Sequence, residues 1–187
     1  MIRAFIAIPF EEEAKSAILN VIENLKASIK TNVRWVARDN IHLTLKFLGY
    51  INEQQLNRAK HAMDDLKDIN AFKIDLLQIG CFPSISSPRI IWIGIKQQDN
   101  VKQLFDIIER HIHDINKEDR TFSAHITIGR VKGTINVHEL EKIKKLWNDT
   151  IINSSFVDRV VLFQSILGSK GAVYSPLYDV KLKKEAL

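Results

Sequence analysis

The sequence is poor in sulfur and lacks long apolar runs. Its 187 residues include a single cysteine, Cys81, so no disulfide can form within the chain. A chain of this kind suits a reducing compartment, and we expect a cytoplasmic protein. No apolar run approaches the ~20 residues that span a bilayer. The apolar stretch 2–9 is followed at once by acidic residues, so we expect neither a secretion signal nor a membrane partner.

Several sequence signatures of cofactor sites are also missing. There is no glycine-rich phosphate loop and no dinucleotide-binding fingerprint, which argues against an ATP- or NAD-dependent enzyme. No spacing of Cys, His or carboxylate residues matches a zinc site. His111 and His113 are two residues apart, and such residues do not share a helical face. We therefore expect no cofactor and no metal.

The composition is that of a soluble globular protein. Apolar residues make up 45% of the chain and charged residues 26%, and the length suits one domain or two small lobes that share a core. The formal net charge is +5. A basic balance favours polyanionic partners such as RNA, although a solvated surface would explain it equally well.

Hydrophobic periodicity predicts alternating strands and helices. Period-two alternation and apolar runs predict strands over residues 2–8, 33–36, 41–48, 72–79, 89–96, 122–130, 156–166 and 173–182. Spacings of three and four predict helices over residues 11–29, 52–66, 100–115 and 136–147, and a loop covers residues 80–88. The order strand, helix, strand occurs in 2–48 and again in 89–130. We interpret this as an internal duplication, with residues 1–187 forming one domain of two pseudo-symmetric lobes.

The second strand of each copy carries the same four-residue cassette of histidine, apolar residue, threonine and apolar residue. Strand side chains alternate between faces, so His42 shares one face with Thr44, and His125 shares one face with Thr127. The apolar residues on the opposite faces are suited to a core. The two polar pairs should then line a cleft. The cassettes are His42-Leu43-Thr44-Leu45 and His125-Ile126-Thr127-Ile128.

Two imidazoles and two hydroxyls around one space suit the opening of a cyclic phosphodiester. Histidine accepts and donates protons near neutral pH, and this reaction needs a base for water and an acid for the leaving oxygen. Threonine hydroxyls can hold the other phosphate oxygens. A lone histidine on a strand is usually structural, but two matched cassettes in matched repeats favour a site.

The chain resembles the two-histidine (2H) phosphoesterase superfamily and, within it, the RNA 2′,3′-cyclic phosphodiesterases, once called 2′-5′ RNA ligases. The similarity spans almost the whole chain. Many relatives have a proline before the second histidine, where this chain has Ala124. The matching segments are 3–8, 33–36, 40–49, 80–83, 89–94 and 122–130, with Ser165 and Tyr174 near the end.

The resemblance implies an α+β, bilobal duplicated fold with two antiparallel sheets around a central groove and helices outside. It also implies metal-independent hydrolysis of RNA 2′,3′-cyclic phosphate ends to 2′-phosphates. By that analogy His42 donates a proton to the departing 3′-oxygen and His125 accepts one from water. The RNA could be a tRNA fragment or a short oligonucleotide, and nothing demands more than a monomer.

Four further residues are candidates for substrate binding. Arg130 could bind phosphate, although simple alternation places it opposite His125 unless the strand twists or bulges. Lys46 has the parity of the groove beside Thr44, although a solvated lysine at the rim would explain it equally well. Ser123 shares the face of His125. Trp35 could stack a base or could be core, and three further aromatic residues are expected to pack in the core: Phe47, Trp92 and Trp147.

Two other functions stay open at the level of sequence. The reverse reaction, with the same histidines, would join RNA ends through a 2′-5′ linkage, but hydrolysis should dominate in dilute water. Alternatively the basic chain could bind RNA or a nucleotide without chemistry. A pure binding module has no need for two matched proton carriers, which favours the enzyme.

Overall fold

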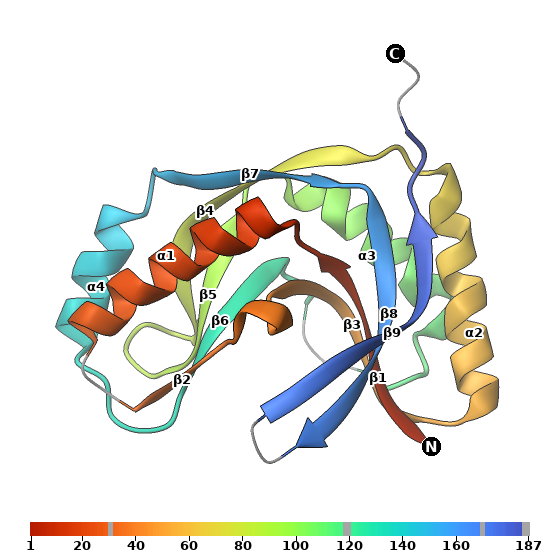
Figure 1. Cartoon of the computed structure of the whole chain (residues 1–187), viewed down its shortest axis with the longest axis horizontal. Helices are drawn as coiled ribbons and strands as arrows, with labels where there is room; N and C mark the ends of the chain where they lie inside the picture. Colours follow the sequence, from red (N-terminus) through yellow and green to blue (C-terminus); the bar gives the residue numbers. More distant parts are fainter. Residues whose placement is uncertain (30–31, 118–120, 169–170, 185–187) are drawn as a thin grey trace.

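The computed structural model describes residues 1–29, 32–117, 121–168 and 171–184. Two antiparallel sheets form its centre (Figure 1). In order across the sheet, sheet A contains β3 (His42–Ile51), β1 (Ile2–Pro9), β8 (Arg159–Gly168) and β9 (Gly171–Lys181). Sheet B contains β2 (Val33–Trp35), β6 (His125–Val131), β5 (Pro88–Ile95), β4 (Phe72–Pro83) and β7 (Ile151–Val157). The expected α+β fold with two antiparallel sheets is confirmed.

Helices cover the outer side of each sheet. The helices α1 (Glu12–Ser28) and α4 (Val137–Leu146) pack on β7 and β4 of sheet B, whereas α2 (Glu53–Asp64) and α3 (Gln98–Ile112) pack together on sheet A (Figure 1). The short 3₁₀ helices η1 (Arg38–Asn40) and η2 (Asp65–Asp68) complete the fold. None of the described helices is long and apolar enough to cross a membrane.

The two lobes, one built on sheet A and the other on sheet B, each contain elements from both halves of the chain. The helix α1 follows β1 of sheet A but packs on β7 of sheet B, and α3 follows β5 of sheet B but packs on β3 of sheet A. The strand β2 comes from the first half and joins sheet B, while β8 and β9 come from the second half and join sheet A. Because neither lobe is a continuous segment, we propose that the chain folds as one domain.

Several predicted boundaries are wrong, and two of the differences affect how the strands pair. Residues 156–166 do not form one strand: β7 ends at Val157 in sheet B, and β8 begins at Arg159 in sheet A. Apolar residues lie on both sides of Asp158, and for this reason the sequence predicted one continuous strand. The loop predicted over 80–88 is shorter, because β4 continues to Pro83 and pairs with β5 as far as Pro88.

Two helix starts agree with the predicted caps. The Asn52 side chain accepts a hydrogen bond from the Gln55 backbone N–H, and the Gln55 side chain accepts one from the Asn52 N–H. The Asn136 side chain accepts hydrogen bonds from the N–H groups of His138 and Glu139. These caps satisfy orphan donors and set where α2 and α4 begin after their strands.

Candidate active site

The structure brings the two cassettes together where the sheets meet. His42 is the first residue of β3 and His125 the first residue of β6, and these two strands are in contact. The apolar cassette residues point into the core, and Leu43 and Ile126 are both fully buried. The two histidines are close enough that their charges, when both are protonated, repel one another.

Both imidazole rings are held by the same local contact. His42 Nδ1 lies 2.8 Å from the carbonyl oxygen of Asn40, and His125 Nδ1 lies 2.7 Å from that of Ser123. A carbonyl only accepts, so each Nδ1 carries the hydrogen and each neutral ring presents Nε2 as an acceptor. His42 Nε2 lies 3.0 Å from Thr44 Oγ1, which can therefore donate to it. The contact fixes the tautomer as well as the ring orientation.

Aromatic rings desolvate both histidines. The His42 ring has centroid distances of 4.9 Å to Phe5 and 5.4 Å to Tyr174. Phe82 lies 4.9 Å from the His125 ring, and Trp92 lies 6.4 Å from it. Trp92 is thus only partly buried and flanks the site, where the sequence predicted core.

Burial is the main cause of a lowered pKa at both histidines. It lowers the pKa of His42 from 6.5 to about 4, against the hydrogen bond to Asn40, which raises it. Burial also lowers the pKa of His125, again opposed by its carbonyl contact, to Ser123. The positive charge of Arg130 lowers the pKa of both rings further. In the free protein both imidazoles are therefore neutral at pH 7.

A β-bulge lies at the last residue of each cassette. Opposite β3, Ile6 pairs with Lys46 and Ala7 with Thr44, which leaves Leu45 as the extra residue. Opposite β6, Ile91 pairs with Gly129 and Trp92 with Thr127, which leaves Ile128 as the extra residue. The first six residues of both strands then show the same burial sequence: partly buried, buried, partly buried, buried, buried, exposed. The likeness between the two cassette strands therefore extends to this irregularity of the backbone.

The bulges reverse the faces of the residues that follow. Lys46 turns away from the groove, is 6% exposed, and donates to Glu109 of α3 at 2.6 Å. The prediction that Lys46 lines the groove is wrong for this reason. Phe47 was expected to pack in the core, but it is 40% exposed and lines the groove instead. Arg130, which occupies the equivalent position after the second cassette, also lines it.

The groove has a volume of about 430 Å³ and receives residues from both lobes. The first cassette contributes His42 and Thr44 and the second Thr127, whereas His125 is not among the lining residues. Trp35, for which the sequence left base stacking and core packing open, lines the groove from β2. Ser123 is not among its lining residues, and its contribution is the carbonyl oxygen that holds His125. Four cationic side chains also line it: Arg3, Arg34, Arg130 and Lys132.

Sequence reasoning missed Arg3, Phe5 and Tyr174 as groove residues. Phe5 is buried on β1 yet contacts the His42 ring, and Tyr174 reaches it from β9. The resemblance included these positions but assigned them no role, and only sheet pairing brings β9 beside β1 through β8. Within the described ranges, no group of three or more His, Cys, Asp or Glu residues is arranged to hold a metal ion.

Comparisons with known proteins agree with this geometry. The family model described as LigT like Phosphoesterase matches residues 8–92. An RNA 2′,3′-cyclic phosphodiesterase from Thermotoga maritima is 32% identical over 186 residues, which cover 97% of this chain and 96% of the relative. Its namesake from Archaeoglobus fulgidus is 29% identical over 176 residues, covering 94% and 97%.

The fold is similar to that of a solved member of the same family. The crystal structure of Escherichia coli LigT in its apo form superposes with a TM-score of 0.75 at 23% identity, over 97% of both chains. At that identity the likeness concerns the fold alone, whereas the Thermotoga maritima relative is similar in sequence over nearly its whole length. The protein belongs to the family of LigT-like phosphoesterases.

Proposed function

We propose that this protein hydrolyses 2′,3′-cyclic phosphates at RNA ends to 2′-phosphates, with His42 and His125 as a metal-independent acid and base. One observation carries the proposal: two neighbouring imidazoles are held by carbonyl oxygens through Nδ1, which leaves both Nε2 atoms for proton transfer. The name shared by the two relatives, RNA 2′,3′-cyclic phosphodiesterase, supports the reaction.

The reaction needs two proton transfers around one phosphorus atom. A water oxygen attacks phosphorus and gives a proton to one imidazole. The bond from phosphorus to the 3′-oxygen breaks, and that oxygen takes a proton from the other imidazole. Thr44 and Thr127 donate hydrogen bonds to the non-bridging oxygens, and Arg130 stabilises their negative charge. When substrate binds, the Thr44 hydroxyl turns from His42 Nε2 to the phosphate and frees that nitrogen.

The different surroundings of the cassettes support a division of labour. The exposed Phe47 ring and Tyr174 lie on the His42 side and offer a stacking surface for the terminal base. A base bound there brings its ribose, and hence the leaving 3′-oxygen, beside His42. Water must then attack in line from the opposite side, where His125 receives its proton. His42 is the acid in this arrangement.

Substrate binding must change the protonation of the acid. Burial and the charge of Arg130 lower the pKa of His42, so it is neutral in the free protein at pH 7. A bound phosphodiester brings a negative charge, which favours the protonated imidazole and raises its pKa. The acid is therefore charged as the substrate binds. The base stays neutral, because water and not an anion occupies its side.

The reaction is tested with an oligoribonucleotide that ends in a 2′,3′-cyclic phosphate, incubated in EDTA. The expected product has gained one water and carries its phosphate on the 2′-oxygen, as read by mass and by sensitivity to phosphatase. Unchanged RNA, or turnover that requires an added metal ion, contradicts the proposal.

The roles of the histidines are tested with alanine variants and a modified substrate. His42→Ala and His125→Ala should each lower kcat by about 10²–10⁴-fold. A substrate whose 3′-oxygen is replaced by sulfur has a leaving group that needs no acid. With this substrate the kcat of His42→Ala should be largely restored, and that of His125→Ala should stay low. Rescue of His125→Ala instead would reverse the two roles.

A further inference from the structure

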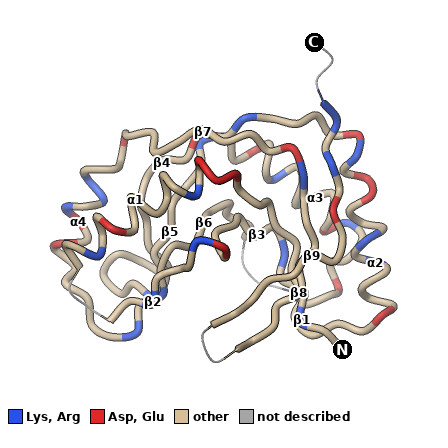
Figure 2. Tube along the Cα trace, viewed as in Figure 1, with Lys and Arg blue, Asp and Glu red and all other residues tan. Residues whose placement is uncertain are grey.

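The groove carries an uncompensated row of positive charge on sheet B. Arg34 of β2 lies directly opposite Arg130 of β6 in the antiparallel pair, and Lys132 is two residues further along the same chain. Residues at these positions project from one face of a sheet. Figure 2 shows the Lys and Arg positions in blue beside β2 and in the adjoining loop. All three side chains line the groove.

These three cations have no carboxylate partner among the ion pairs of the described residues. Like charges directly opposite one another on a sheet destabilise the fold. Some cations elsewhere on the surface are paired, as Arg58 is with Asp114 and Lys67 with Asp64, so what distinguishes these three is that they line one groove together. An unpaired row of cations on the wall of a groove is suited to an anionic ligand.

The reacting group supplies too little negative charge for this row. A cyclic phosphodiester carries one negative charge near neutral pH, and Arg130 beside the histidines is placed to meet it. Arg34 and Lys132 remain. Lys132 follows the last residue of β6, and its N–H still donates to the carbonyl oxygen of Asn32. The spacing of alternate residues in extended backbone, about 7 Å, therefore separates Arg130 from Lys132 and leaves room for a second phosphate. The cyclic phosphate closes the 3′ end of RNA, so further phosphates can only lie on the 5′ side.

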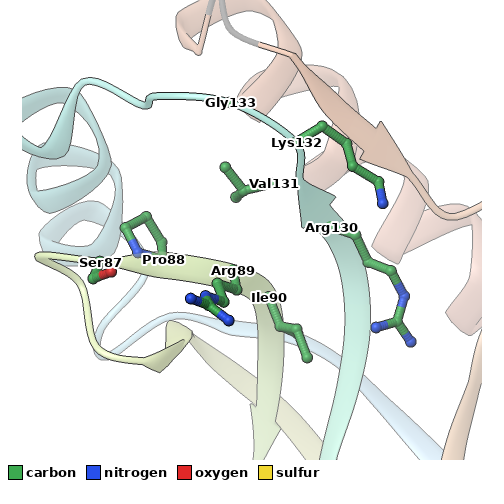
Figure 3. A pocket seen from close by; sticks show the side chains of 8 residues that line it. All are labelled: Ser87, Pro88, Arg89, Ile90, Arg130, Val131, Lys132 and Gly133. Atoms are coloured by element: carbon green, nitrogen blue, oxygen red, sulfur yellow. The ribbon is translucent and has the colours of Figure 1, made fainter.

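A second cavity continues the row beyond the groove. It has a volume of about 560 Å³ and lies between the start of β5 and the end of β6. Arg130 and Lys132 line both cavities, and Arg89 is added on the β5 side. Figure 3 shows Arg89 directed away from the Arg130 and Lys132 side chains, so cations lie on both sides of the end of β6. The shared lining residues Arg130 and Lys132 connect the groove to the cavity that contains Arg89.

We propose that Arg34 and Lys132, with Arg89 beyond them, bind the phosphodiester backbone on the 5′ side of the reacting RNA end. The inference rests on the proposed function and deepens it by naming the substrate class. The substrate is an oligoribonucleotide of three or more nucleotides and not a mononucleoside cyclic phosphate.

Substrate length tests this assignment. We compare kcat/KM for a mononucleoside 2′,3′-cyclic phosphate, its 5′-phosphorylated form, and the di-, tri- and tetranucleotides with the same end. The trinucleotide should exceed the mononucleotide at least tenfold, and the 5′-phosphorylated mononucleotide should fall between them. Equal values for all lengths overturn the inference and leave the proposed function standing. A 5′-phosphate that alone gives the full gain also overturns it, because the cations then bind a terminal phosphate.

Variants identify the residues. Arg34→Gln and Lys132→Gln should each lower the ratio of trinucleotide to mononucleotide kcat/KM about tenfold. Each should also make the fall of trinucleotide kcat/KM with salt shallower, by about 0.7 in the logarithmic slope. Arg110→Gln is the matched control, because Arg110 is an exposed residue of α3 that lines neither cavity. An unchanged ratio in both groove variants overturns the assignment.

Binding separates this inference from the proposed function. An oligonucleotide that ends in a 2′-phosphate, labelled at its 5′ end, reports affinity by fluorescence anisotropy without turnover. Loss of affinity in Arg34→Gln and Lys132→Gln, but not in Arg110→Gln, supports the backbone site even if no cyclic phosphate is opened. Equal affinity of all four proteins overturns it.

Discussion

Replacing Lys46 with methionine separates a structural role for this residue from a role in substrate binding. The ammonium group is buried and lies 2.6 Å from the Glu109 carboxylate, whose side chain is 29% exposed. Removing one partner of a fully buried ion pair costs about 3–5 kcal/mol, because the other charge loses its partner. Since Glu109 can regain some hydration, we expect Lys46→Met to lower the free energy of unfolding by about 1–3 kcal/mol.

Urea unfolding followed by circular dichroism measures this loss, and kcat/KM for an oligonucleotide cyclic phosphate measures function. Below the unfolding transition, kcat/KM should stay within about twofold of the original protein, since Lys46 faces away from the groove. Lys102→Met is the control, because Lys102 pairs with Asp106 at an exposed site and should change stability by less than about 0.5 kcal/mol.

A double replacement tests the physical reason for the loss. Lys46→Met with Glu109→Leu removes both charges, so it should recover most of the stability lost by Lys46→Met alone. A tenfold fall in kcat/KM for Lys46→Met with unchanged stability would refute the reasoning and indicate that Lys46 binds the substrate.

Three other predictions concern the site and its walls. Because the pKa of His42 is about 4 when folded and 6.5 when unfolded, acidification between those values should cost about 3 kcal/mol of stability. Between pH 7 and pH 4, His42→Gln should therefore lose about 3 kcal/mol less stability than the original protein, as measured by urea titrations at both pH values. An equal loss in the two proteins would contradict the burial argument. Phe47→Ala should raise KM about tenfold with little change in kcat if the ring stacks a base, and an unchanged KM excludes stacking. In Gly80→Ala the new Cβ would overlap the Trp92 ring, so thermal unfolding should show a loss of about 1–3 kcal/mol. A loss below about 0.5 kcal/mol would mean that the indole moves freely.

The sequence predicted features that depend on near neighbours. Alternation within four residues separates His42 and Thr44 from Leu43, and the same holds for the second cassette. The caps at Asn52 and Asn136 involve hydrogen bonds that span only two or three residues. Such features could be predicted because they depend only on residues that are close together in the sequence.

Features that depend on strand pairing could not be derived in this way. The reversal of Lys46 and Phe47 follows from an extra residue in β3 opposite β1, and a bulge is defined by the partner strand and not by its own residues. Arg130 was left undecided for the same reason. The change of sheet at Asp158 and the packing of α1 on the other lobe are likewise long-range outcomes.

The shared bulge also explains how two equal cassettes can perform unequal tasks. His, Thr and the carbonyl contact at Nδ1 are common to both strands, so by themselves they give the substrate no direction. The fifth residue after each histidine is turned into the groove by its bulge, and there the copies differ: Phe47 is aromatic and Arg130 is cationic. An aromatic ring attracts the base, and a guanidinium attracts phosphate. We therefore propose that the two similar strands supply the paired proton carriers, and that a single position in each strand orients the substrate between them.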